Sequence, residues 1–315
     1  MTLRITGVTI SRMKQELQPL LGLLIIYAIF AILSSTFRTF DTFKTILTQA
    51  VILGTLAVSA TIVLISGGLD LSIGSLFGLI AVCTGRMFLS GVPVVLVVIF
   101  SLAIGAACGA LNGTIIVGTG IPSFIGTLGM MKAYRGLAEL LGANRDMSQF
   151  PEFFQMIGRG YLTPISIMVV TFLLVYIILS RTKLGFNCYA IGGSNEMARR
   201  AGVPVKKYYL VYYTLGGLCA AVSAIILASR LNFTNSSWGV GLELNAIGAV
   251  IIGGTSLTGG VGGVGRTVIG VLIVTTLNAG LSHLGVSSSW QRISIGAVII
   301  FAVWLDIMQR KREAR

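Results

Sequence analysis

Residues 46–65 read ILTQAVILGTLAVSATIVLI, twenty residues without a single charged side chain. A helix needs about 20 mostly apolar residues to cross the hydrocarbon core of a bilayer, and this stretch meets that requirement. The next residues are Ser66-Gly-Gly-Leu-Asp-Leu-Ser-Ile-Gly74, where adjacent glycines interrupt the apolar pattern. The sequence therefore predicts a membrane-spanning helix that runs into a glycine-rich segment.

The rest of the chain has the same apolar character. Of its 315 residues, 55% are hydrophobic and only 10% are charged, and the mean hydropathy is +0.91. Soluble chains carry about 25% charged residues, so this one has too few to cover a water-facing surface. We expect an all-α integral membrane protein with about ten transmembrane helices, at 19–37, 46–65, 70–88, 92–116, 123–141, 161–180, 208–230, 244–261, 267–285 and 291–308.

The distribution of Lys and Arg predicts the orientation. If the N-terminus is cytoplasmic and the chain crosses ten times, fourteen basic residues fall in cytoplasmic segments and six on the opposite side. Cytoplasmic loops are enriched in Lys and Arg, so we expect both termini in the cytoplasm. Residues 1–18 then form a cytoplasmic N-terminal segment, 19–308 a single transmembrane domain and 309–315 a cytoplasmic tail. The net charge of +13 is explained by these segments, and no nucleic acid is expected as a partner.

Two connections are longer than the others. Residues 142–160 face outward in this scheme and contain Arg145, Asp146 and Glu152. Residues 181–207 face inward and carry the densest charge in the chain. Function is therefore expected in the helix bundle and in these two loops.

Glycines form two patterns in the predicted helices. The segments 66–74 and 253–260 both contain G-G-x-x-L-[ST]-x-G. Adjacent glycines cost about 1 kcal/mol each inside a helix, so they predict glycine-broken helices or very close contacts. In transporters such segments point to the substrate pathway, and both a pathway role and helix packing remain open here. Gly105, Gly109 and Gly113 predict a ridge against which a neighbouring backbone packs closely.

Asp70 is the most informative acid, because a carboxylate in an apolar membrane segment is costly and usually functional. It can line a pathway or cap the start of the third helix, near the positive end of the helix dipole. Ser72 lies beside it. Asn112 and Asn278 lie within the fourth and ninth predicted spans, where each can hydrogen-bond a sugar hydroxyl or a neighbouring helix. These four residues are the candidate substrate pathway.

The sequence contains no catalytic or metal-binding pattern. No G-x-x-x-x-G-K-[ST] loop is present to bind nucleotide phosphates, and the single histidine, His283, has no evident nucleophile or base beside it. One histidine without clustered cysteines or carboxylates does not make a metal site. We expect the chain to be no enzyme and to bind no cofactor itself.

The inward loop carries start and stop signals for a short helix at residues 194–202. Ser194 or Asn195 can cap it, Glu196 falls in its first turn and Gly202 ends it. A helix lying across the cytoplasmic face is suited to docking into a partner's groove. The alternative is that the loop only satisfies the preference for positive charge inside.

Several stretches together point to one family. They are GGLDLSIG at 67–74, NG at 112–113, PSFIGTLG at 122–129, YRG at 134–136, AIGG at 190–193, GLEL at 241–244 and AVIIGGTSL at 249–257. With these stretches the chain resembles, from about residue 50 to 305, the membrane permeases of ribose-type sugar ABC importers. One departure is Phe186, where the family usually has Arg in the cytoplasmic motif.

The resemblance implies a set of partners and a location. Such permeases form a two-copy core, from identical chains or with a sister permease, in the bacterial inner membrane. Two ATPase subunits, which bind ATP and Mg²⁺, and a periplasmic sugar-binding protein join this core. By the match, the inward helix would be the coupling helix in the ATPase groove, through Ser194, Asn195, Glu196, Ala198, Arg199, Arg200 and Gly202. The binding protein would meet Arg145, Asp146, Glu152 and Glu243.

The expected mechanism is alternating access. Closure of the ATPases would move the coupling helices and reorient the bundle, so that a ribose-like pentose, a furanose or a related sugar or polyol enters the cytoplasm. The alternative is a secondary transporter driven by an ion gradient, which would place acids or broken-helix ion sites at midmembrane. Asp70 and Glu139 are the candidate acids for that alternative.

Overall fold

The computed structural model describes residues 19–143 and 145–313, and they are mostly helical. The helices are Pro19–Leu33, α2 (Phe40–Ile65), α3 (Ile73–Leu89), α4 (Val94–Thr119), α5 (Ser123–Gly142), α6 (Glu152–Gly158), α7 (Leu162–Arg181), α8 (Lys183–Gly193), α9 (Asn195–Arg200), α10 (Val205–Leu231), α11 (Leu242–Ile252), α12 (Val264–His283) and α13 (Ser288–Glu313). A 3-10 helix, η1 (Thr36–Arg38), precedes α2. Two short strands, β1 (Met147–Ser148) and β2 (Phe233–Thr234), form an antiparallel pair.

Each of the ten predicted segments contains a helix, which confirms the all-α membrane class. Among the described residues, α2, α4, α7, α10 and α12 are long and apolar enough to cross a bilayer. Pro19–Leu33, α3 and α11 are shorter apolar helices. The largest difference concerns the predicted span 244–261, because α11 ends at Ile252. The predicted N-terminal segment 1–18 and residues 314–315 of the predicted tail lie outside the described residues.

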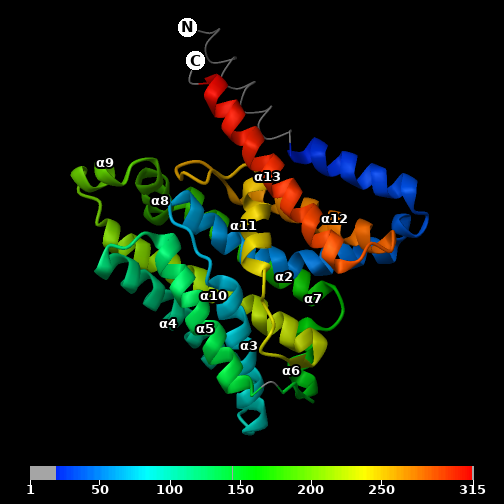
Figure 1. The fold of residues 1–315 in the computed structure, drawn as a ribbon. Coiled ribbons are helices and arrows are strands. Elements are labelled where there is room, and N and C mark those ends of the chain that lie inside the picture. The colour runs from blue at the N-terminus through cyan, green and yellow to red at the C-terminus, as the bar shows by residue number, and fades with distance from the viewer. Residues whose placement is uncertain (1–18, 144, 314–315) are drawn as a thin grey trace.

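Helix α2, which contains the stretch 46–65, lies at the centre of the bundle. It packs against α7, α10, α11 and α12 (Figure 1), and every residue from Ala50 to Ile65 is buried. A helix that is apolar on all sides is stable when other helices surround it. The hydroxyls of Thr55 and Ser59 donate to carbonyls of α2 itself, and that of Thr61 also reaches a neighbouring helix. The hydroxyls of Thr61 and Thr267 lie 2.6 Å apart.

The close packing predicted for the glycine ridge of α4 is confirmed, and its partner is α10. A Cβ on Gly105 would overlap the carbonyl oxygen of Gly217, and one on Gly113 would lie 2.8 Å from the Cα of Leu210. The absence of side chains along this ridge lets the two backbones approach to a distance that alanine would not allow.

The two G-G-x-x-L-[ST]-x-G segments both end a helix, α2 in one case and α11 in the other. Gly67 and Gly254 adopt left-handed backbone conformations, with φ of 80° and 91°. In each case the next residue donates its N–H to the carbonyl five residues earlier, at 2.9 and 3.1 Å. This is the Schellman arrangement, which favours glycine at the left-handed position. It explains why α11 stops before the apolar pattern does.

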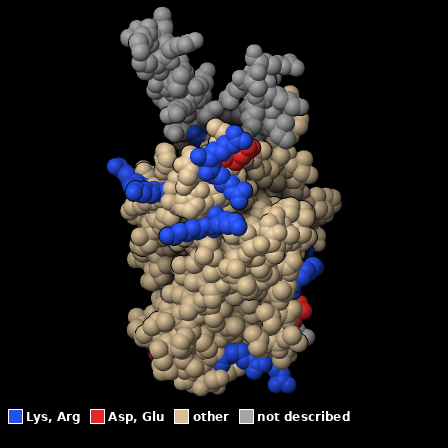
Figure 2. Space-filling model, turned by 90° about the vertical axis from the view of Figure 1, so that its left-hand side faces the viewer, with Lys and Arg blue, Asp and Glu red and all other residues tan. Residues whose placement is uncertain are grey.

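Charge is distributed unevenly over the surface. On the face shown in Figure 2, Lys and Arg gather mainly at the upper end, where α8 and α9 lie, and a few lie at the opposite end. A broad band between them is almost free of charge. This is the surface expected of a chain that crosses a bilayer with its basic loops at the interfaces.

Candidate functional site

Asp70 lies in the turn between α2 and α3 and is only 4% exposed. Its Oδ1 accepts hydrogen bonds from the backbone N–H and the hydroxyl of Ser72, at 2.8 and 2.7 Å. Asn112 donates from Nδ2 to the Ser72 hydroxyl oxygen at 2.7 Å. The Tyr134 hydroxyl donates to Asn112 Oδ1 at 2.9 Å. The four side chains form a buried hydrogen-bonded chain that ends on the carboxylate of Asp70.

Three of the four candidate pathway residues therefore come together in the structure. Asn278 lies in α12, partly exposed, and does not belong to this hydrogen-bonded chain. Tyr134 completes the chain, although the only sequence signal for it was its place in the YRG stretch. Asp70 fixes the backbone just before α3 by accepting the N–H of Ser72, but it does not cap the helix, because Ser72 is the N-cap residue and no side chain caps α3. Within the described ranges, no three His, Cys, Asp or Glu side chains are grouped so that they could hold a metal ion.

Three Gly-Gly pairs from distant parts of the chain meet near α8 and α9, namely 67–68, 192–193 and 259–260. The N–H of Gly260 donates to the carbonyl of Ile65 at 2.9 Å. A Cβ on Gly259 would lie 2.8 Å from both the Cα of Gly67 and the carbonyl oxygen of Gly192, and one on Gly192 would overlap the Ile65 carbonyl. We call this backbone-to-backbone contact the glycine junction. It joins both glycine-broken segments to the end of α8.

Helix α8 itself was not foreseen, because its sequence lay in a charged loop. It is fastened to the bundle by side-chain hydrogen bonds. The Cys188 thiol donates to the carbonyl of Ile62 at 3.3 Å, and burial raises the pKa of this thiol to about 12, so it stays protonated. The Tyr189 hydroxyl donates to the carbonyl of Gly262 at 3.1 Å. These contacts tie α8 to α2 and to the loop after α11, which lies beside α8 in Figure 1.

The short helix expected at residues 194–202 is present as α9. The Ser194 hydroxyl accepts the backbone N–H of Met197 at 3.3 Å, as an N-cap does. Glu196 and Arg200 form an ion pair across one turn. Gly202 ends the helix in a left-handed conformation with φ of 81°.

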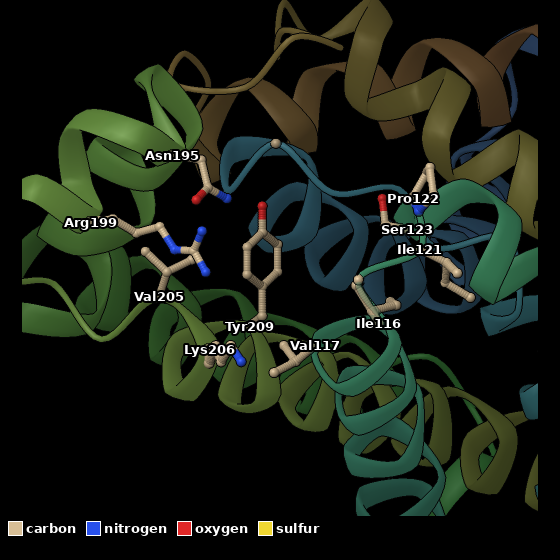
Figure 3. Close-up of a pocket in the computed structure, with 12 residues that line it drawn as sticks. Ile116, Val117, Ile121, Pro122, Ser123, Asn195, Arg199, Val205, Lys206 and Tyr209 are labelled. Atoms are coloured by element: carbon tan, nitrogen blue, oxygen red, sulfur yellow. The ribbon is translucent and has the colours of Figure 1, made fainter.

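The residues of α9 point in different directions. Ala198 is 5% exposed and packs onto the bundle, whereas Met197 is 64% exposed. Asn195 and Arg199 line a pocket together with Tyr209 of α10, as Figure 3 shows. Arg199 is therefore directed at the pocket, and the neighbouring ion pair lies on the exposed surface.

At the opposite end, the outward loop 142–160 pairs with the segment that follows α10. Strand β1 of the loop and strand β2 form the two-stranded sheet. Beside it, the side-chain amide of Asn235 donates to the carboxylate of Asp146. Arg145, Asp146 and Glu152 are all exposed, so three of the four candidate docking residues lie on the surface.

Glu243, the fourth candidate docking residue, lies beneath the surface at 8% exposure. Its Oε1 accepts the N–H of Gly241 at 3.3 Å, while Oε2 lies against Gly74 and has no hydrogen-bond partner among the described residues. Glu243 can be buried there because Gly74 of α3 has no side chain and leaves room for the carboxylate. Near it, Arg135 donates to the carbonyls of Ser236 and Trp238 at 2.6 and 2.8 Å, a contact that sequence reasoning missed.

Comparisons with known proteins agree on one family. Residues 42–303 match the family model described as branched-chain amino acid transport system / permease component. The chain is 40% identical to the ribose import permease protein RbsC of Bacillus subtilis, over 95% of this chain and 94% of the relative. It is 39% identical to RbsC of Escherichia coli K12, over 83% and 84%, and 34% identical to that organism's galactose/methyl galactoside import permease protein MglC, over 85% and 87%. No solved structure matches it significantly. The chain is thus a multi-pass membrane protein that belongs to this family of transport-system permeases, together with the sugar import permeases of ABC importers.

Proposed function

We propose that this chain is the membrane permease subunit of an ATP-binding-cassette importer that carries a monosaccharide into the cytoplasm across a bacterial inner membrane. The relatives are named for ribose, galactose/methyl galactoside and D-allose, so a pentose, a hexose or a related polyol is the substrate class. The feature that supports the proposal is α9, a capped helix that directly follows α8, whose end lies in the glycine junction. An ion-gradient transporter has no need of such a helix.

The complex would contain two ATPase subunits, a second copy of this chain or a sister permease, and a periplasmic sugar-binding protein. ATP and Mg²⁺ would be bound by the ATPase subunits, because this chain has no phosphate-binding loop. Ten crossings with both termini in the cytoplasm would put α9 on the ATPase side and the β1–β2 sheet on the other. Arg145, Asp146 and Glu152 would then form the surface for the binding protein.

On the ATPase side, the exposed surface of α9 would enter the ATPase groove. Glu196, Met197 and Arg200 supply an ion pair and an apolar side chain for that contact. Ser194 and Gly202 fix the two ends of the helix, and Ala198 holds its base against the bundle. Asn195 and Arg199 connect the helix to the pocket behind it.

Movement of α9 would reach the membrane segments through the glycine junction. Because the contact involves backbone atoms without intervening side chains, little of a displacement is absorbed by rotamer changes. Both glycine-broken segments would shift together, and the turn at Asp70 would carry the shift to α4 and α5 through Ser72 and Asn112. A sugar in the open pathway could replace some of these internal hydrogen bonds by its own hydroxyls. Asn278 would line the pathway from α12.

Reconstitution into proteoliposomes tests the proposal. When the chain is combined with an ATPase and a sugar-binding protein of such an importer, we expect sugar uptake that requires ATP and all three components. Met197→Asp should abolish co-purification with the ATPase, because it places a charge on the apolar contact, whereas Met156→Asp, on the exposed surface of α6, should not. Uptake by the isolated chain under an ion gradient alone would refute the proposal.

A further inference from the structure

A pocket of about 430 Å³ lies between α9, the start of α10 and the turn that joins α4 to α5 (Figure 3). The described residues that line it include two cations, Arg199 of α9 and Lys206 of α10, and no Asp or Glu. Among the described residues the ion pairs are Lys44 with Asp41 and Arg200 with Glu196. Arg199 and Lys206 therefore present two positive charges to the pocket without a carboxylate to balance them.

The backbone around the pocket reinforces this charge. Two long helices begin in its wall, α5 at Ser123 and α10 at Val205, and neither has a side-chain cap. At α10 the N–H of Val205 is already bonded to the carbonyl of Val203 at 2.8 Å, but the positive ends of both helix dipoles favour an anion at such a place. The Asn195 amide also faces the pocket and can donate to a ligand, whereas the Tyr209 hydroxyl donates to the carbonyl of Ser66 at 3.1 Å and can only accept.

The remaining wall is apolar. Ile116 at the end of α4 and Ile121 in the turn line the side opposite Arg199, and Val117 lies between them and Lys206 in the view of Figure 3. The pocket thus has one strongly basic side and one aliphatic side, at the end of the molecule where basic residues gather. Arg and Lys at short range from helix N-termini are well suited to phosphate oxygens.

We infer that this pocket binds a phosphate group, carried by an anionic phospholipid of the adjacent leaflet or by a soluble phosphate ester. The phosphate lies between Arg199 and Lys206, and the organic part of the ligand lies along Ile116, Val117 and Ile121. A bound phosphate bridges α9 to α10 and to the α4–α5 turn. It therefore holds α9 in one position relative to the bundle.

The test uses the purified full-length chain in detergent micelles. Native mass spectrometry measures binding of a phosphatidylglycerol, a phosphatidylcholine and glycerol phosphate. The chain supplies matched controls, since all four cations are exposed but only Arg199 and Lys206 line the pocket, whereas their neighbours Arg200 and Lys207 do not. The variants are therefore Arg199→Gln and Lys206→Gln against Arg200→Gln and Lys207→Gln.

We expect each pocket variant to weaken phosphatidylglycerol binding about tenfold, the effect of one charge-assisted hydrogen bond, and the control variants to bind as the unmodified chain does. The same pattern with glycerol phosphate, and none with the lipids, supports the soluble source. Absence of binding to every probe, or equal weakening in all four variants, overturns the inference. The measurement needs no ATPase, so its failure is distinct from failure of the proposed transport function.

Discussion

The two glycine-rich segments have nearly the same sequence pattern and the same helix exit, yet they are held in different ways. In the first, Asp70 binds the backbone and hydroxyl of Ser72. In the second, Ser256 occupies the equivalent place and its hydroxyl accepts the N–H of Thr258 at 3.1 Å. The local turn is therefore similar, with a carboxylate in one and a hydroxyl in the other.

The difference lies in what surrounds each turn. The backbone N–H groups of Leu69 and Leu71 donate to the hydroxyls of Ser123 and Thr127, both on α5, and Asp70 continues into the hydrogen-bonded chain. In the second segment the N–H of Ser256 donates to the carbonyl of Val261 at 2.9 Å. The glycine junction holds this segment against the rest of the bundle. The comparison indicates one segment anchored by side chains of neighbouring helices and one attached mainly through backbone contacts.

The largest effect is expected for Gly192→Ala, which breaks the contact between the two segments. Its Cβ would overlap the Ile65 carbonyl and lie 2.5 Å from the N–H nitrogen of Gly260, and backbone cannot move aside as a side chain can. We expect a loss of at least about 4 kcal/mol in stability, or no recoverable protein. Gly193→Ala is the control, because nothing lies within 4 Å of its added Cβ. SDS titration in mixed micelles measures both, and equal stability of the two variants would show that the junction is not tightly packed.

The next effect compares the two turns directly. Asp70→Ala removes an acceptor of two hydrogen bonds and leaves the donors of Ser72 unpaired, so we expect it to cost about 3 kcal/mol. Ser256→Ala removes a neutral hydroxyl and should cost about 1 kcal/mol. The same mixed-micelle titration gives both values. A larger loss of stability for Ser256→Ala than for Asp70→Ala would show that the second segment, and not the first, is the one anchored by side chains.

Removing one tyrosine hydroxyl that contacts each glycine-rich segment should loosen that segment and not the other. Tyr134→Phe leaves Asn112 without its donor, and Tyr189→Phe frees the carbonyl of Gly262. Each should cost about 1 kcal/mol. Hydrogen exchange followed by mass spectrometry should then rise over residues 69–73 for the first variant and over 255–263 for the second. Faster exchange in both regions from either variant would mean that the two segments open together.

The smallest effect is expected for Thr255→Val. The Thr255 hydroxyl is buried and has no hydrogen-bond partner among the described residues, so an apolar side chain of the same shape should raise stability by up to about 1 kcal/mol. Thr61→Val should instead lower stability by about 1 kcal/mol, because its hydroxyl is paired with Thr267. A destabilised Thr255→Val would reveal a bound water or another partner at that hydroxyl.

The sequence was sufficient to predict the long apolar helices because such runs have few alternatives. The glycine ridge at Gly105, Gly109 and Gly113 and the short helix at 194–202 were also predictable, since small-residue spacing and capping signals act locally. The grouping of Asp70 with Ser72 followed from their adjacency. Its extension to Asn112 depends on how α4 packs beside the turn, so no local pattern could have placed it there.

The sequence predictions failed where tertiary contacts decide whether a helix forms, where it ends or whether a side chain is buried. Helix α8 contains Gly185, Gly192 and Gly193, which weaken a helix in isolation, and its stability comes from packing on α2 and α7. The span 244–261 was drawn too long because hydropathy continues past the point where Gly254 ends the helix. Glu243 was placed at the surface because the space beside Gly74 is visible only in three dimensions.

The glycine junction, in which backbone packs directly on backbone, has an evolutionary consequence. Where Gly192 meets Ile65 and Gly260, no side chain exists that selection could lengthen, shorten or recharge. Sequence changes that alter this chain's contacts must therefore be accommodated elsewhere, on the exposed surface of α9 or around the Asp70 turn, while the glycine junction is kept whole or lost altogether.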